Sequence, residues 1–65
     1  MARLAEIKDA SSKGQPARTV YVNPLNVNSV EPIPGGTRIT FNGGQVIQTS
    51  LDVTEVVGII QNSMV

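Results

Sequence analysis

The tripeptide Asn42-Gly43-Gly44 joins two segments that read as β-strands, residues 37–41 and residues 45–50. The first segment alternates strictly, and one of its faces carries Thr37, Ile39 and Phe41. Asn-Gly between such segments is the strongest short-range signal for a β-hairpin, because both residues tolerate the positive φ of a type I′ turn. We therefore predict an antiparallel hairpin over residues 37–50.

The sequence leaves two registers open for this hairpin. If Asn42-Gly43 forms the loop, Phe41 lies opposite Gly44. If Gly43-Gly44 forms the loop, Phe41 lies opposite Val46, which pairs two apolar side chains. In either case Gly43 is expected to adopt positive φ.

A helix is predicted directly after the hairpin. Asp52 is a favoured N-cap residue, and Glu55 three residues later gives the spacing of a capping box. Apolar residues then recur at the spacing of one helix face: Val53, Val56, Val57 and Ile60. We expect an α-helix over about residues 52–62 that depends on packing against the sheet, because Gly58 and the β-branched residues lower its intrinsic stability.

Two further strands are predicted upstream. Residues 19–23 alternate, and Pro24 ends this strand. Its apolar face carries Val20 and Val22. Residues 26–33 resume an extended pattern, but their aliphatic side chains recur every three residues, which predicts a turn or bulge near residues 28–29. Pro32 and Pro34, within and after this segment, either limit it to a sheet edge or end it.

The N-terminal region is less determined. Residues 1–10 fit either a helix or a short edge strand with Ala5 and Ile7 on one face. Residues 11–17 are polar and predict a flexible loop. The whole pattern predicts a single small domain over residues 1–65 of the α+β class, mainly β: a small antiparallel β-meander with a C-terminal α-helix.

The size of the chain favours self-association. A domain of 65 residues buries little surface, and with no Cys and no His it lacks disulfides and the usual zinc ligands. Burial of a shared face is the remaining common way to add apolar area. We therefore expect a homo-oligomer.

Net charge and hydropathy limit the kinds of binding partner and the cellular location that we expect. The formal net charge is zero, which argues against nucleic acid as a partner. No apolar run approaches the ~20 residues of a membrane span, and the N-terminus has no apolar stretch typical of a secretory signal. We expect a cytoplasmic protein without membrane insertion.

The residue set predicts no enzyme, no metal site and no cofactor. Nucleophilic triads need a general base, and the chain has no His to serve as one. Hydrolysis of sugars needs two carboxylates across a cleft, and two of the five acidic residues are assigned to helix capping. The two Gly-Gly pairs precede strands and lack the Lys-Ser/Thr of phosphate loops. The natural contacts for a small anionic ligand are Arg18, Tyr21, Asn23 and Arg38.

The order of features over residues 19–60 resembles the small FlbD-like (SwrD-like) family of flagellar-operon proteins, which also occurs in phage genomes. The matching segments are Val22-Asn23-Pro24, Val30-Glu31, Thr37-Arg38-Ile39-Thr40-Phe41, Asn42-Gly43 and Glu55-Val56-Val57. The resemblance implies a small, non-enzymatic accessory protein, and it supplies no binding residues to transfer.

Three hypotheses of function follow. The first is a bacterial or phage interaction protein that acts as a homo-oligomer and binds a protein partner. The second is a phage protein that binds a small molecule and sequesters a nucleotide signal through the four contacts named above. The third is a transcription-related regulator, which needs a basic face that the composition hardly supplies.

Overall fold

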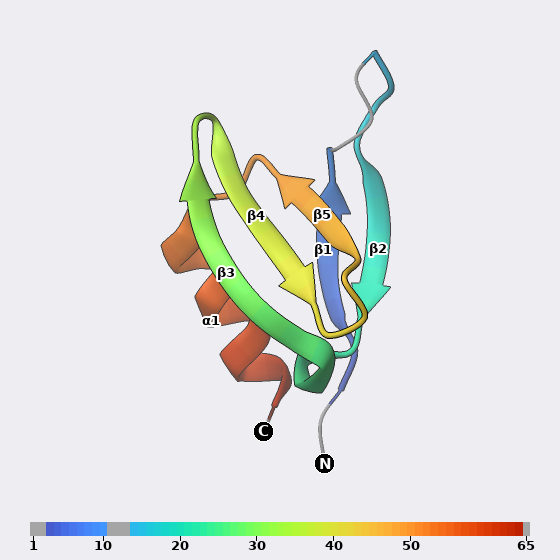
Figure 1. Cartoon of the computed structure of the whole chain (residues 1–65), viewed down its shortest axis with the longest axis vertical. Coiled ribbons are helices and arrows are strands. Elements are labelled where there is room, and N and C mark those ends of the chain that lie inside the picture. The colour runs from blue at the N-terminus through green and yellow to red at the C-terminus, as the bar shows by residue number, and fades with distance from the viewer. Residues whose placement is uncertain (1–2, 11–13, 65) are drawn as a thin grey trace.

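The computed structural model describes residues 3–10 and 14–64. Within these ranges the chain forms five strands, a short 3₁₀ helix and one α-helix: β1 (Ala5–Asp9), β2 (Arg18–Val22), η1 (Pro24–Asn26), β3 (Val27–Ile33), β4 (Gly36–Phe41), β5 (Val46–Thr49) and α1 (Val53–Ser63). β1 pairs with β2, and β3, β4 and β5 form a second antiparallel sheet in that order (Figure 1). The α+β, mainly β fold with a meander followed by a helix is confirmed.

The N-terminal segment is a strand rather than a helix. β1 alternates, with Glu6 and Lys8 exposed between the buried residues Ala5, Ile7 and Asp9. The backbone N–H of Ala10 donates to the carbonyl of Gln48 at 2.6 Å and so joins this hairpin to β5. Residues 14–17, the described part of the loop predicted at residues 11–17, are exposed; residues 1–2 and 11–13 lie outside the described residues.

The connection from β2 to β3 contains an element that the sequence analysis missed. After β2, η1 begins at Pro24, and the Asn23 side chain accepts a hydrogen bond from the Leu25 N–H at 3.0 Å. The predicted irregularity in the next strand is confirmed as a bulge between Val27 and Ser29. β3 lies at an edge of its sheet, as its prolines predicted.

The β4–β5 loop differs from both predicted registers. The loop has three residues, because the Phe41 N–H donates to Gln45 O at 2.8 Å and the Gly44 N–H donates to Phe41 O at 2.9 Å. Ile39 consequently pairs with Ile47. Positive φ falls on Gly44, at +89°, and not on Gly43. A three-residue loop of this kind needs only its last residue in the left-handed region, so the type I′ prediction was wrong.

The helix begins as predicted but without the predicted capping box. Asp52 occupies the N-cap position in an extended conformation, yet its carboxylate makes no capping bond to any described residue. Two threonines hold the connection from β5 instead. The buried Thr37 hydroxyl donates to Leu51 O at 2.8 Å, and the Thr49 hydroxyl accepts from the Leu51 N–H at 3.3 Å. Side chains of the sheet, and not a capping box, therefore hold the chain in place where it enters α1.

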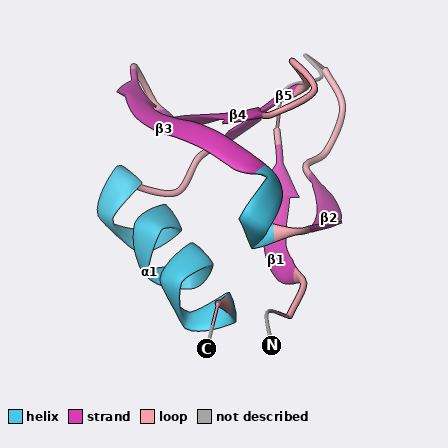
Figure 2. Cartoon of the chain, turned by 60° about the horizontal axis from the view of Figure 1, so that its bottom comes forward, coloured by secondary structure: helices cyan, strands magenta, loops and turns pink. Residues whose placement is uncertain are grey.

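The core lies where α1 meets both sheets. Its buried apolar residues are Ala5, Ile7, Val22, Ile39, Phe41, Val56 and Ile60. α1 contacts β1, β3, β4 and η1, and Figure 2 shows it beneath the β3–β4–β5 sheet. Val57, a predicted core residue, is 37% exposed, because it lies about 100° around the helix from Val56. Ile59 packs against the core in its place.

The two ends of the fold lie side by side. The Arg3 N–H donates to Ser63 O at 2.7 Å, and the Arg3 guanidinium lies 3.4 Å from Asn62 O. A cation at the last carbonyls of a helix is stabilised by the helix dipole. No helix in residues 3–10 and 14–64 is long and apolar enough to cross a membrane.

Candidate functional site

A groove opens between β2 and the β4–β5 hairpin, with a volume of about 610 Å³. This volume falls within the ~300–1,000 Å³ range of ligand pockets. The apolar part of its lining comes from both sheets: Val20, Val22, Phe41, Val46 and Ile47. The polar part consists of Asp9, Arg18, Tyr21, Asn23, Asn26 and Gln45.

Strand alternation builds the first wall. In the β1–β2 ladder, Val20 lies opposite the buried residue Ile7. Val22 likewise lies opposite the buried residue Ala5. Directly opposite residues point to the same face, so both valines belong to the inner face of this sheet. That face lies next to β5, which contacts β1 and passes in front of it in Figure 1.

The second wall comes from the β4–β5 hairpin. Phe41 is buried at the end of β4, and the three-residue loop returns the chain so that Gln45 lies opposite it. The next residue, Val46, is 46% exposed and lines the groove. Val46 lies opposite Thr40, on the outer face of the meander, so its exposed side chain borders the groove at its rim and not on its floor.

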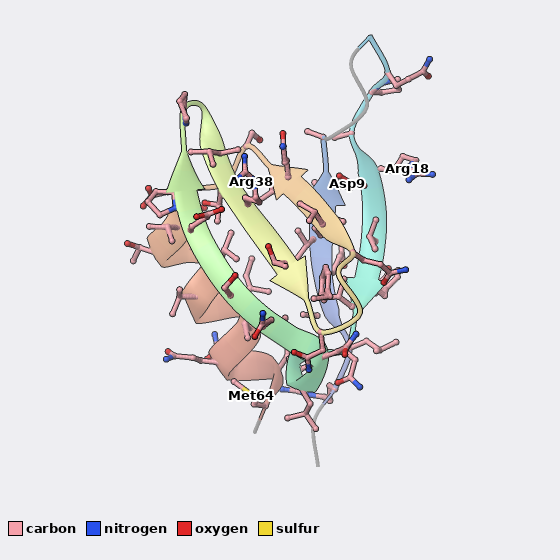
Figure 3. All side chains as sticks on the ribbon, viewed as in Figure 1. Asp9, Arg18, Arg38 and Met64 are labelled. Carbon is pink, nitrogen blue, oxygen red and sulfur yellow. The ribbon has the colours of Figure 1, made fainter. Side chains whose placement is uncertain are left out.

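One end of the groove carries charge. Arg18 and Asp9 are direct partners across the β1–β2 ladder, with Nη2 of Arg18 3.8 Å from Oδ2 of Asp9 (Figure 3). The Arg18 side chain is 74% exposed, whereas that of Asp9 is 8% exposed. The guanidinium, rather than the carboxylate, is therefore the charge that a ligand in the groove meets.

The other end carries neutral amides held in place by η1. The Asn26 N–H donates to Asn23 O at 2.9 Å, and Asn26 O accepts from the Asn42 N–H at 2.9 Å. These bonds tie the end of β2 to the β4–β5 loop. Asn23, Asn26 and Gln45 thus offer both donors and acceptors at this end of the groove.

Three of the four predicted ligand contacts line the groove: Arg18, Tyr21 and Asn23. Tyr21 lies between Val20 and Val22 in the strand, so its side chain belongs to the other face of β2. It is 62% exposed. The phenol ring is therefore at the rim of the groove and not on its floor.

Arg38, the fourth predicted contact, does not join the others. It lies on β4 directly opposite Glu31 of β3, with 2.8 Å between Nη1 and Oε1. Figure 3 shows Arg38 well apart from Asp9 and Arg18. Its role in the structure is an exposed cross-strand ion pair on the outer face of the meander.

Sequence reasoning missed Asn26, Gln45 and Val46 as lining residues. Asn26 reaches the groove through η1, and Gln45 and Val46 reach it through the three-residue loop. The Asn-Pro at residues 23–24 was the available signal for η1, because Asn before Pro commonly starts a turn. The loop length had no comparable signal.

The groove offers groups for noncovalent recognition: a guanidinium, a phenol, neutral amides and an aliphatic floor. In the part of the chain that the structure describes, no group of three or more His, Cys, Asp or Glu residues could hold a metal ion. Comparison of the chain with models of protein families, with curated proteins and with solved structures finds no match.

Proposed function

We propose that this chain is a small, non-enzymatic accessory protein that self-associates and binds a protein partner through the groove between β2 and the β4–β5 hairpin. The observation that carries the proposal is the mixed lining of this groove, in which the half-buried Val20 and Ile47 and the exposed Val46 are bordered by amides and by Arg18. The resemblance of residues 19–60 to the FlbD-like accessory family points in the same direction.

The composition of the groove suits a protein partner. Protein interfaces combine an apolar centre with a polar rim and are enriched in Tyr and Arg. Here Val20 and Val46 belong to the apolar lining, and Tyr21, Arg18 and Asn23 supply the polar groups. A partner that covers Val46 and Tyr21 removes exposed apolar surface from water, which favours binding.

A second exposed apolar cluster supports self-association. It consists of Leu4, Leu25 and Met64. The bond between Arg3 and Ser63 brings Leu4 and Met64 close together, and η1, which carries Leu25, lies at the same end of the molecule in Figure 1. A second copy that covers this cluster adds the apolar burial that one small chain lacks.

Site-specific photo-crosslinking tests the groove as the binding surface. A photoreactive amino acid replaces Val46 in one variant and Val57 in the control, since both are partly exposed valines on different surfaces. In lysate of the organism that carries the gene, we expect a discrete adduct from position 46 that excess unlabelled wild-type protein removes. Equal adducts at both positions, or none at position 46, would contradict the proposal.

A nucleotide or similar small anion is the second candidate, because Arg18, Tyr21 and Asn23 line one groove. The exposed guanidinium suits a phosphate, whereas the phenol offers a base a contact at the rim of the groove only. Thermal-shift measurements with a panel of nucleotides test it. We expect stabilisation that Arg18→Ala abolishes and Arg38→Ala retains if this candidate is right; no shift with any nucleotide excludes it.

A further inference from the structure

The backbone of β5 is open on the side that faces the groove. In an antiparallel ladder, alternate residues direct both backbone groups to the same side. Gln45 O bonds to Phe41 N on the β4 side, whereas Gln48 O bonds to Ala10 N on the opposite side. Val46 has the same parity as Gln48, so its N–H and C=O also point away from β4, toward the groove that Val46 lines.

This edge is little used by the fold. Among the described residues, the bond from Ala10 to Gln48 is the sole backbone hydrogen bond between β5 and the β1–β2 sheet. An edge with unpaired backbone groups is a template for one more strand. The inner face of β2, with Val20 and Val22, lies across the groove from it and can cover the side chains of such a strand.

The charge of the groove indicates which kind of added strand would bind there. Of the two charged lining residues, Asp9 is buried and Arg18 is exposed, so a complementary strand carries an acidic side chain. The β5 edge of a second copy does not fit, because residues 45–50 contain no acidic residue. The floor also lacks an aromatic ring available for stacking, since Phe41 is buried and Tyr21 lies on the other face of β2, which disfavours a nucleotide.

We propose that the protein partner binds as an extended segment that adds a strand to the β5 edge inside the groove, with an Asp or Glu side chain at Arg18. This inference rests on the proposed function and names the form of its partner. Backbone bonds to Val46 give affinity, the apolar floor takes alternate side chains, and Arg18 sets the preference for acid.

A displayed library of random heptapeptides tests the chemistry of the partner. We expect selected peptides to alternate apolar residues and to carry one Asp or Glu at a fixed position. Arg18→Gln should remove the preference for acid, and Arg18→Glu should replace it with a preference for Lys or Arg. Arg38→Glu is the matched control and should leave the selection unchanged, because Arg38 lies outside the groove. Circular dichroism confirms that each variant is folded, and Arg18→Gln alone decides if the charge reversal fails to fold.

N-methylation of the best synthetic heptapeptide tests the backbone bonds. Methylation of the one residue that donates to Val46 O should weaken binding by about three- to tenfold, the size of one hydrogen bond, while methylation of its two neighbours should be tolerated. Exchange of the acidic residue for its amide should weaken binding by about two- to fivefold with the wild type and not with Arg18→Gln.

The outcomes separate this inference from the proposed function. If no peptide is selected, if selected peptides lack the acid, or if no single N-methylated position weakens binding more than its neighbours, strand addition is wrong. A partner-specific adduct at position 46 in that case leaves the groove as the binding surface for a partner of another form. Selective stabilisation by a nucleotide, with no peptide bound, overturns both and favours the second candidate.

Discussion

Gly36 begins β4 and Gly44 ends the loop that follows β4, and the two glycines are required for different physical reasons. At Gly36 the restriction is steric: a Cβ atom built there would lie 1.9 Å from the backbone oxygen of Thr49. At Gly44 there is space, with no atom of another described residue within 4 Å of such a Cβ, but φ is +89°. The first restricts how closely β4 approaches the end of β5, and the second restricts how the chain reverses.

The turn glycines give a matched pair of variants. Gly44→Ala should lower the free energy of unfolding by about 1–2 kcal/mol, because an L-residue at this position takes a left-handed conformation. Gly43→Ala should have little effect, since Gly43 does not have positive φ. Chemical denaturation of both variants measures the difference. A larger loss for Gly43→Ala would restore the type I′ turn.

The close approach at Gly36 predicts a larger effect. Gly36→Ala should destabilise by more than Gly44→Ala, because the new Cβ meets a backbone oxygen that cannot move without separating the ends of two strands. Gly58→Ala is the control in the opposite direction. Its added Cβ meets no described neighbour within 4 Å, and Ala in place of Gly in a helix interior should stabilise by up to about 1 kcal/mol. Thermal unfolding compares the variants. If Gly36→Ala and Gly58→Ala have the same Tm, β4 and β5 do not approach each other as described.

For individual residues, the sequence predicted the position of a turn better than it predicted which glycine in the turn has positive φ. The glycine-rich segment at residues 42–44 correctly marked a turn. The assignment of positive φ to Gly43 was wrong, because loop length decides which position is left-handed and composition does not set that length. Gly36 carried no signal, since its restriction comes from Thr49, thirteen residues away.

At the scale of elements, the junction between β5 and α1 depends on threonines of the sheet. Thr37 is fully buried on β4, and its hydroxyl donates to Leu51 O just before the helix. Thr37→Val should lower stability by about 1–3 kcal/mol, because the carbonyl of Leu51 is left without this partner. Thr40→Val on the same strand but the other face should be nearly neutral. Equal effects in urea denaturation would show that the Thr37 bond does not stabilise the junction.

The same junction changes what is expected of the helix cap. Because the Asp52 carboxylate bonds no described backbone amide, Asp52→Ala should cost less than about 0.5 kcal/mol, below the 0.5–2 kcal/mol typical of a working N-cap. Its effect should also be additive with that of Glu55→Ala. A double-mutant cycle measures this, and a coupling near 1 kcal/mol would establish the capping box after all.

Element types were predictable here and their partners were not. Alternation in residues 37–41 and helical spacing after Asp52 depend on local sequence, and both elements are present. The two Thr hydroxyls that hold Leu51 depend on the β4–β5 register, which local sequence left open. The N-terminal strand was one of two alternatives, and the choice depended on pairing with β2, which begins nine residues after β1 ends.

At the scale of the whole molecule, the groove exists because two hairpins that pair separately are packed against one helix. Arg18 and Asn23 were selected from sequence by residue type, as contacts for a small anionic ligand, and both line the groove. The sequence contained no information on how the β1–β2 sheet lies relative to β5, so Val46 and Gln45 could not be assigned to the same site. Arg38 was selected by residue type alone, and its cross-strand partner Glu31 accounts for its position.

The arrangement of buried and exposed residues indicates which surface would form the contact between copies. Phe41 is part of the monomer core, so Phe41→Lys should unfold the chain and does not report on an interface. The face of β4 that carries Arg38 and Thr40 is polar and a poor surface for burial. The exposed apolar cluster of Leu4, Leu25 and Met64 is the better candidate for contact between copies.

We therefore predict that thermal stability rises with protein concentration and that Leu25→Lys removes this dependence. For a dimer of such small chains, a hundredfold dilution should lower Tm by about 5–10 °C, because dissociation is coupled to unfolding. Leu25→Lys should give a folded monomer whose Tm is independent of concentration, while the control Thr40→Lys keeps the dependence, since Thr40 lies on the polar face of β4. Light scattering gives the mass of each species alongside the melts. A wild-type chain of monomer mass throughout, with one Tm across the dilution series, would mean that the core beneath α1 is sufficient for a single copy to fold.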